Sequence, residues 1–220
     1  MVPPRLTPSV SASPTIVSDQ RHHGYLYGVK ERPLNIPVLI GTVRQGRMSE
    51  HAARLVHNEL SKRPGVETQL IDIQELGVAS DDEGEAIKVP SFSAALDRAD
   101  GVVITSPEYN HGYPGMLKHV MDTNSWEYVH KAVGVVSVSS GPFGGGRMIE
   151  NLLPVLRAYG LVPISRDVSI PNVHGVFGEE GQLLDERFLH RIDGFLAELI
   201  WMAKTLRYGR EHIANEAKNR

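Results

Sequence analysis

Three short apolar runs punctuate this chain, and each leads into a polar or glycine-rich loop and then into a helical pattern. The runs are 36–41, 101–105 and 132–138, and each has the length of a strand. They lack the polar alternation of a strand with one face in water. This is typical of strands buried on both faces, which occur in parallel sheets covered by helices.

Two further strands are expected, one over 66–73 and one within 161–170. Between the strands, helical patterns are expected over 49–63, 91–97, 116–122, 147–159 and 185–207. The regular alternation of strand and helix predicts an α/β fold. We expect a doubly wound, five-stranded parallel sheet with strand order 2-1-3-4-5 and helices on both faces.

Two of these helices contain informative residues. Ser49 is the expected N-cap of the first, because a hydroxyl at this position accepts a hydrogen bond from the helix start. Pro64 and Gly65 are expected to end that helix. Pro154 conflicts with the helix over 147–159, because a proline inside a helix removes one hydrogen bond.

Residues 1–34 are rich in proline and serine and show no periodicity, so we interpret them as a flexible extension. The alternative is an arm that wraps a partner subunit and is anchored by Tyr25 and Tyr27. Residues 35–220 have the length of one domain with a sizeable core.

Composition excludes several classes of protein. The chain has no cysteine, so disulfides, thiolate metal sites and a cysteine nucleophile are excluded, and redox chemistry requires a cofactor. A net charge of −3 without a basic stripe argues against nucleic acid and against an anionic membrane as partners. No apolar run reaches the roughly 18 residues of a membrane helix, and no apolar signal-peptide segment begins the chain. A cytoplasmic location is expected.

The loop after the run 101–105 contains the most chemistry. The six residues 107–112 offer a carboxylate, an aromatic ring, an amide, a histidine and a bare glycine backbone. The loop follows a parallel strand at its carboxyl end, where open α/β sheets bind their ligands. Such a mixture suits a flat ligand that forms hydrogen bonds, such as a flavin.

The loop after the first run, 42–49, favours a phosphate. It contains the hydroxyls of Thr42 and Ser49, the cations Arg44 and Arg47, and the N–H groups of a helix start. It is neither a Walker A loop nor a Gly-x-Gly-x-x-Gly turn, which disfavours a nucleoside triphosphatase and a dinucleotide-binding fold. The alternative is an ordinary turn with solvated arginines.

The loop after the third run, 139–146, is rich in glycine and precedes a helix. Glycine lets a backbone approach a ring closely, and a helix start carries positive potential. Such N–H groups would stabilise the negative charge that a flavin develops when it accepts hydride. The alternative is a flexible loop.

Other candidate groups point to no further chemistry. No spacing of histidines and carboxylates predicts a metal site, and no Gly-x-Ser-x-Gly elbow is present. His111 is expected at the rim in a positional role. Trp126 is expected in an interface or in the core.

Taken together, these segments resemble the NADPH-dependent FMN reductase family, which has a flavodoxin-like fold. The matching segments are 41–44 with Ser49, then 106–110 with 114–118, and finally 140–141 with 144–147. The resemblance covers residues 36–208. Thr42 stands where serine is usual, and His119 and 123–125 depart from the common pattern at that helix end, where a dimer contact is expected.

The resemblance implies hydride transfer from NADPH or NADH to bound FMN, and then to a quinone, an azo compound, a metal oxyanion or free flavin. It implies a homodimer or a dimer-based homotetramer. It assigns no catalytic side chain, because FMN performs the chemistry. The FMN phosphate is expected in the first loop, with Arg44 favoured over Arg47, and the flavin ring against the other two. The expected FMN-binding residues are Thr42, Arg44, Met48, Ser49, Pro107, Glu108, Tyr109, Asn110, His111, Ser140, Gly141, Gly144 and Gly145.

A different class of function uses the same fold. The chain is alternatively an FMN-binding electron carrier, or a redox-dependent interaction protein, without significant turnover. The acidic docking surface usual in an electron carrier is missing at a net charge of −3.

Overall fold

The computed structural model describes residues 32–79 and 87–213. The chain divides into two units, Met1–Arg32 and Pro33–Arg220, and the second contains the architecture described here. The expected extension, with Tyr25 and Tyr27, lies outside the described residues as far as residue 31. Leu34 is buried and begins the first strand. In the described ranges, no helix has the length and apolar character needed to cross a membrane.

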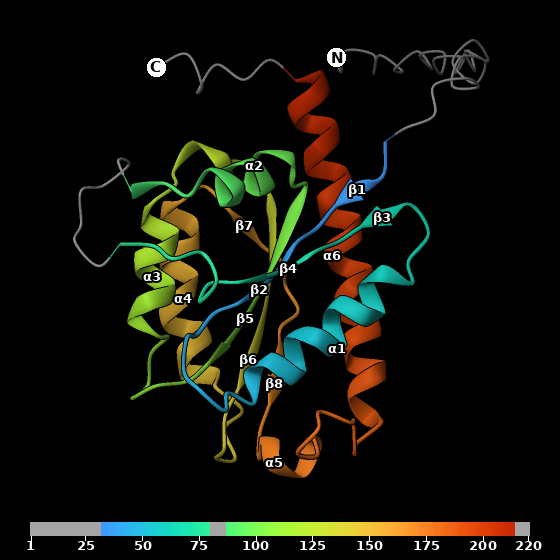
Figure 1. Cartoon of the computed structure of the whole chain (residues 1–220). Coiled ribbons are helices and arrows are strands. Elements are labelled where there is room, and N and C mark those ends of the chain that lie inside the picture. The colour runs from blue at the N-terminus through green and yellow to red at the C-terminus, as the bar shows by residue number, and fades with distance from the viewer. Residues whose placement is uncertain (1–31, 80–86, 214–220) are drawn as a thin grey trace, which may run out of the picture. The chain divides into compact units, whose positions relative to one another are not determined.

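A parallel sheet forms the centre of the fold, with the order β4-β2-β5-β6-β7 and with β8 also paired to β6 (Figure 1). The two last strands pair with successive parts of β6, so they are two pieces of one edge strand. Counted in this way, the order is the expected 2-1-3-4-5, and the predicted fold class is confirmed. The bounds are β2 Val38–Ile40, β4 Leu70–Asp72, β5 Gly101–Pro107, β6 Ala132–Val138, β7 Val162–Pro163 and β8 Val168–Ile170.

Two strands of the sheet continue beyond a break as a second parallel pair, β1 (Leu34–Asn35) and β3 (Val66–Glu67). The break falls at Pro37, which has no N–H to donate to a ladder. Pairing continues across it, because the N–H groups of Ile36 and Val38 donate to the carbonyls of Glu67 and Gln69 at 2.9 Å each.

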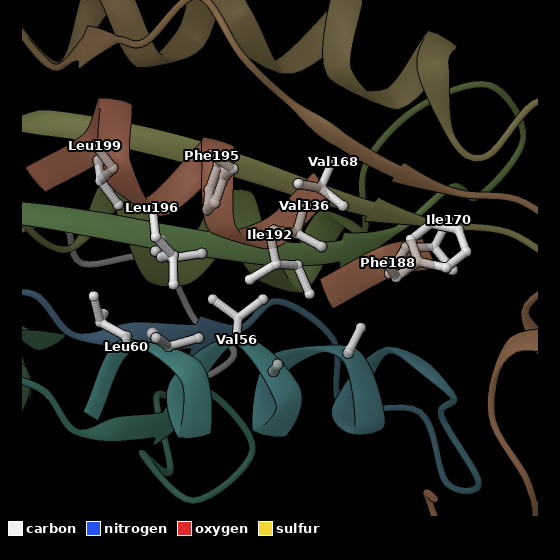
Figure 2. Close-up of a cluster of buried hydrophobic side chains, with 14 of the residues drawn as sticks. Val56, Leu60, Val136, Val168, Ile170, Phe188, Ile192, Phe195, Leu196 and Leu199 are labelled. Atoms are coloured by element: carbon white, nitrogen blue, oxygen red, sulfur yellow. The ribbon is translucent and has the colours of Figure 1, made fainter. Parts of the chain in front are cut away.

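Helices cover both faces of the sheet, as expected for its buried strands (Figure 1). On one face, α1 (Ser49–Ser61) and α6 (Arg187–His212) enclose one apolar cluster with the sheet, part of which Figure 2 shows. On the other face, α2 (Pro90–Arg98), α3 (Gly115–Asp122) and α4 (Gly146–Ala158) enclose the second cluster. Two short helices that the sequence patterns do not predict are the 3-10 helix η3 (Trp126–Tyr128) and α5 (Val173–Val176).

Pro154 lies inside α4 without ending it, and its position is exposed.

Helix α6 runs five residues beyond its expected end at Arg207. The ring of Phe195 on α6 packs directly against Gly134 of β6, which has no side chain. A Cβ on Gly134 would lie 2.6 Å from the ring atom Cε2, so the close packing requires glycine at this position. Trp126 is 62% exposed, so it does not belong to the core.

Candidate functional site

A cavity of about 600 Å³ opens at the carboxyl ends of β2, β5 and β6. Its volume is in the range of small-molecule and cofactor sites. All three loops that the sequence predicts at this rim contribute to its wall. The lining consists of 44–49, 107–109, 138–141, Phe143, Arg147, Val173 and His174.

The two arginines of the first loop have different surroundings. Arg47 is largely buried and forms ion pairs with Asp72 and, at 3.3 Å, with Glu50. It also donates to the carbonyl of Thr42 at 3.0 Å and to Gln74 at 2.6 Å. Arg44 is exposed, lies 5.7 Å from the Tyr109 ring centroid and forms no ion pair with a described residue. Arg44 is therefore the cation available to a ligand, whereas Arg47 fastens the loop to β4.

The start of α1 differs from the expectation. Met48, not Ser49, is the N-cap, and its backbone is already helical, so Ser49 is the first helical residue. The Ser49 hydroxyl is therefore not used as a cap. It is buried and has no hydrogen-bond partner within the described ranges. The N–H groups of Glu50 and His51 turn back to the carbonyls of Arg47 and Met48.

Thr42 does not line the cavity. It is buried, and its hydroxyl lies 3.1 Å from the Tyr109 hydroxyl, which joins the first loop to the second. Its oxygen also accepts a 3.4 Å hydrogen bond from the Arg44 N–H. Thr42 thus holds the two loops in register beneath the cavity.

Pro107, Glu108 and Tyr109 form the central wall, at the end of β5. The Glu108 side chain is only 12% exposed and reaches the start of α4. One carboxylate oxygen accepts a 3.4 Å hydrogen bond from the Met148 N–H, and the other lies 3.7 Å from the Arg147 guanidinium. Glu108 therefore offsets the positive potential of that helix start, which was expected to face a ligand.

Asn110 and His111 form the tip of a hairpin and do not line the cavity. Tyr109 and Gly112 exchange two backbone hydrogen bonds of 2.8 and 2.9 Å. The two residues between them have positive φ, 49° and 69°, as in a type I′ turn. The Asn151 side chain holds the tip by donating to the His111 carbonyl at 2.8 Å.

The glycines of the third loop serve two purposes. Gly141 lines the cavity with Ser140, and nothing lies within 4 Å of the position where its Cβ would be. Gly144 and Gly145 do not line it. Both have positive φ, and a Cβ on either would lie under 3.0 Å from the side chain of Ser169 or Ser137. Their missing side chains admit Ser169 of β8 and Ser137 of β6, and their expected role in binding the flavin ring stays a prediction.

The expected binding residues did not include several that line the cavity, among them Phe143, Arg147, Val173 and His174. Phe143 lies in the glycine-rich loop before α4 and Arg147 in the first turn of that helix, and Gly144 and Gly145 between them have positive φ, so helical spacing does not predict their contact. Val173 and His174 reach the cavity because α5 follows β8, the partner of β6. No local signal marks α5. His174, with its Nε2 3.5 Å from the Ser140 hydroxyl, is the described histidine that lines this cavity.

One acid beside the first loop, Glu50, is held ionised. The pKa of Glu50 is lowered, first because Arg54 donates hydrogen bonds to its carboxylate and further because both Arg54 and Arg47 place positive charge beside it. Glu50 and Asp72 thus compensate the charge of Arg47, and Arg44 contributes the uncompensated positive charge at this side of the cavity.

Comparison with known proteins identifies relatives with matching architecture. Residues 34–175 match the model of the family described as NADPH-dependent FMN reductase. The NADH:(hydroxy)cinnamate reductase subunit CrdA of Vibrio ruber is 27% identical over 176 residues, which are 76% of this chain and 86% of that protein. A quinone reductase of Escherichia coli (strain K12) is 26% identical over 176 residues, 74% of this chain and 92% of that protein. A solved structure with the same architecture is that of FerB, a flavoenzyme NAD(P)H:(acceptor) oxidoreductase from Paracoccus denitrificans. It superposes with a TM-score of 0.64 at 24% sequence identity, and the match covers 78% of this chain and 98% of the FerB chain.

The family match spans well over half of the chain and includes every residue that lines the cavity. The likeness to FerB supports the same fold. This chain therefore belongs to the NADPH-dependent FMN reductase family and is an oxidoreductase with FMN as cofactor and NAD(P)H as co-substrate.

Proposed function

We propose that the cavity holds FMN and that the chain passes hydride from NADPH or NADH through it to a small acceptor such as a quinone. The observation that carries this proposal is the Ser49 hydroxyl, a buried polar group at the start of α1 with no partner among the described residues. A buried hydroxyl without a hydrogen bond costs free energy, which a ligand oxygen recovers.

The surroundings of Ser49 suit a phosphate. The first N–H groups of a helix have no partner within the helix, and those of Met48 and Ser49 have none elsewhere in the described chain. The helix dipole adds positive potential at the same point. Arg44 adds a full charge that no described carboxylate compensates. Hydroxyl, N–H groups and guanidinium together form the donor set that a phosphate monoester requires.

The remaining wall suits the flavin ring. Pro107 to Tyr109 form one side, and Ser139 to Gly141 form the other, where the open space at Gly141 leaves room for a ring edge. The Thr42–Tyr109 hydrogen bond and the pairing of Glu108 with α4 hold these loops in place. When bound, FMN supplies the hydride and electron transfer. The protein contributes position and hydrogen-bond donors, and no side chain is assigned acid–base work.

The acceptor is chosen from the chemistry of the site and from the relatives. A cavity with an aromatic and polar wall suits a quinone, and the E. coli relative is named a quinone reductase. We propose azo compounds, metal oxyanions and free flavin as further electron acceptors. We also propose a homodimer or a dimer-based homotetramer, in which the exposed Trp126 beside α3 is a contact.

Flavin titration tests the phosphate site. We expect Ser49→Ala and Arg44→Ala each to raise the Kd for FMN roughly tenfold or more, because each removes a hydrogen bond or charge from a phosphate. Affinity for riboflavin, which lacks the phosphate, should stay unchanged. Ser61→Ala, at an exposed position of the same helix, and Arg157→Ala, at an exposed position in the last turn of α4, are the matched controls. Equal losses for FMN and riboflavin would show that these residues do not contact the phosphate.

Turnover tests the reaction. Purified protein loaded with FMN should absorb near ~450 nm and oxidise NAD(P)H in the presence of a quinone. A yellow protein that binds FMN but shows no turnover with NADPH or NADH would instead favour an electron carrier or a redox-dependent interaction protein.

A further inference from the structure

Phe143 is the most exposed large apolar side chain of the described residues, at 69%, and it lines the cavity. Its backbone is nevertheless held, because its carbonyl accepts a 3.2 Å hydrogen bond from the Gly146 N–H. The neighbouring Gly144 carbonyl accepts a hydrogen bond from Ser137 at the end of β6. Among the exposed large apolar side chains of the described residues, Phe143 is the one in the cavity wall, where a ligand that covers the ring would gain its burial.

Arg147 stands beside this ring. Its guanidinium carbon lies 4.7 Å from the Phe143 ring centroid, within the range of a cation–π contact. The side chain is 47% exposed, and its guanidinium donates no hydrogen bond to any residue in the described ranges. Glu108 is 3.7 Å away, but its other oxygen is bound to the start of α4. Arg147 therefore keeps its planar set of donors for a partner outside the protein.

The phosphate of FMN does not account for this second cation. In the proposed function the phosphate lies at the start of α1, next to Arg44 on the loop after β2. Arg147 follows β6, which is separated from β2 by β5. The two arginines thus reach the cavity from strands that do not pair with each other, and Arg44 already supplies the cation that the proposed phosphate site uses. The cavity presents two cations, although the whole chain has a net charge of −3.

We propose that Phe143 and Arg147 form the acceptor subsite and select planar aromatic acceptors that bear a carboxylate or sulfonate. The inference rests on the proposed function of the cavity. The acceptor ring covers Phe143, and its anionic group receives the paired N–H donors of Arg147. In the reaction NAD(P)H gives up a hydride, and the quinone gains two electrons, one hydrogen from that hydride and one proton from solvent. The anionic group itself does not react.

The test compares ortho-naphthoquinone with its ring-sulfonated derivative as acceptors for the FMN-loaded protein. We expect Arg147→Gln to lower the ratio of kcat/KM for the sulfonated quinone to kcat/KM for the neutral quinone roughly tenfold, because only the sulfonated quinone has an anionic group to receive the arginine donors. Arg147→Lys should recover only part of the loss, because lysine lacks the planar fork. Arg157→Gln is the matched control: it removes the same charge from an exposed position in the last turn of the same helix.

A binding measurement separates recognition from turnover. Calorimetric titration of the oxidised, FMN-loaded protein with naphthalene sulfonate, which accepts no electrons, should show roughly tenfold weaker binding to Arg147→Gln. Phe143→Ala should weaken binding of naphthalene sulfonate and raise KM for both quinones, because it removes the stacking face.

Three results would overturn the subsite. The first is an equal loss of kcat/KM for both quinones in Arg147→Gln. The second is the same loss of kcat/KM in the control Arg157→Gln. The third is a rise in KM for NAD(P)H alone in Arg147→Gln. The last result would assign the arginine to the hydride donor. Failure of the proposed function looks different, since the unmodified protein would then bind no FMN or would not reduce the neutral quinone.

Discussion

The contact between Gly134 and Phe195 allows a quantitative test of how α6 is seated on the sheet. Gly134 lies in the middle of β6, and its nearest side-chain neighbour is the ring of Phe195 on α6, which is among the clustered residues labelled in Figure 2. A Cβ at Gly134 would lie 2.6 Å from Cε2 of that ring, a separation that forces the ring or the helix to move. The perturbation is Gly134→Ala.

The magnitude follows from two opposing effects. Overpacking a well-filled core costs about 1–3 kcal/mol. Replacing glycine inside a strand with alanine returns about 0.5–1 kcal/mol of backbone entropy. We therefore expect Gly134→Ala to lower the free energy of unfolding by about 1–2 kcal/mol. This corresponds to a fall in Tm of roughly 2–8 °C for a domain of this size.

Phe195→Leu tests the cause. On its own the smaller side chain should also destabilise the fold, because it removes buried apolar volume. In the double variant the shorter leucine leaves room for the new methyl group. The combined loss should then be smaller than the sum of the single losses, with a coupling energy of about 1 kcal/mol or more.

Urea unfolding of the apoprotein, followed by circular dichroism, measures the free energy of unfolding of the unmodified protein, the two single variants and the double variant. The absence of FMN removes its contribution to stability, and an unchanged m-value shows that the same transition is compared. Gly115→Ala is the control, since nothing lies within 4 Å of the Cβ it would add. Additive losses in the double variant would refute the reasoning, because they would show that the backbone of β6 yields instead of the ring.

Two further predictions concern the turn at the rim and a half-buried acid, Asp167. His111→Gly should raise the free energy of unfolding by about 1 kcal/mol in urea titrations, because a side chain at φ 69° is strained, whereas His111→Val should lower it. Burial, and then repulsion from Glu150, raise the pKa of Asp167 to about 6, so the folded state binds this proton more tightly than the unfolded state. Stability should therefore fall as pH rises from about 4 through 6, and Asp167→Asn should raise Tm at pH 7.5 but barely at pH 4. A gain of equal size at both pH values would exclude titration of Asp167 as its source.

The central strands were the most predictable part of the fold. The ends of β6 agree with its expected bounds, because a continuous apolar run buried on both faces has no competing interpretation. The edge strand was only located within 161–170, since its two short pieces are separated by a polar stretch without periodicity. Pro154 argued against α4, but tertiary packing of the buried side of that helix overrides the local penalty.

At the site, residue types were easier to predict than their roles. The sequence placed Arg44 and Arg47 in one loop, but only the fold brings Asp72 of β4 to Arg47 and leaves Arg44 without a carboxylate. The αL turn at Asn110 was likewise hidden, although asparagine is common there. His174 reaches the cavity through pairing between strands that are remote in sequence, which no local pattern reports.

The fastening of Arg47 to β4 has a kinetic consequence. A loop that is already tied down does not need to be ordered when a phosphate arrives, so cofactor capture involves no slow rearrangement on this side of the cavity. Association should then proceed at an ordinary encounter rate, and differences in retention among variants of Arg44 or Ser49 should appear in the rate of release. In the proposed phosphate site, the ion pairs of Arg47 would thus leave the rate of release as the step that sets how long the cofactor is retained.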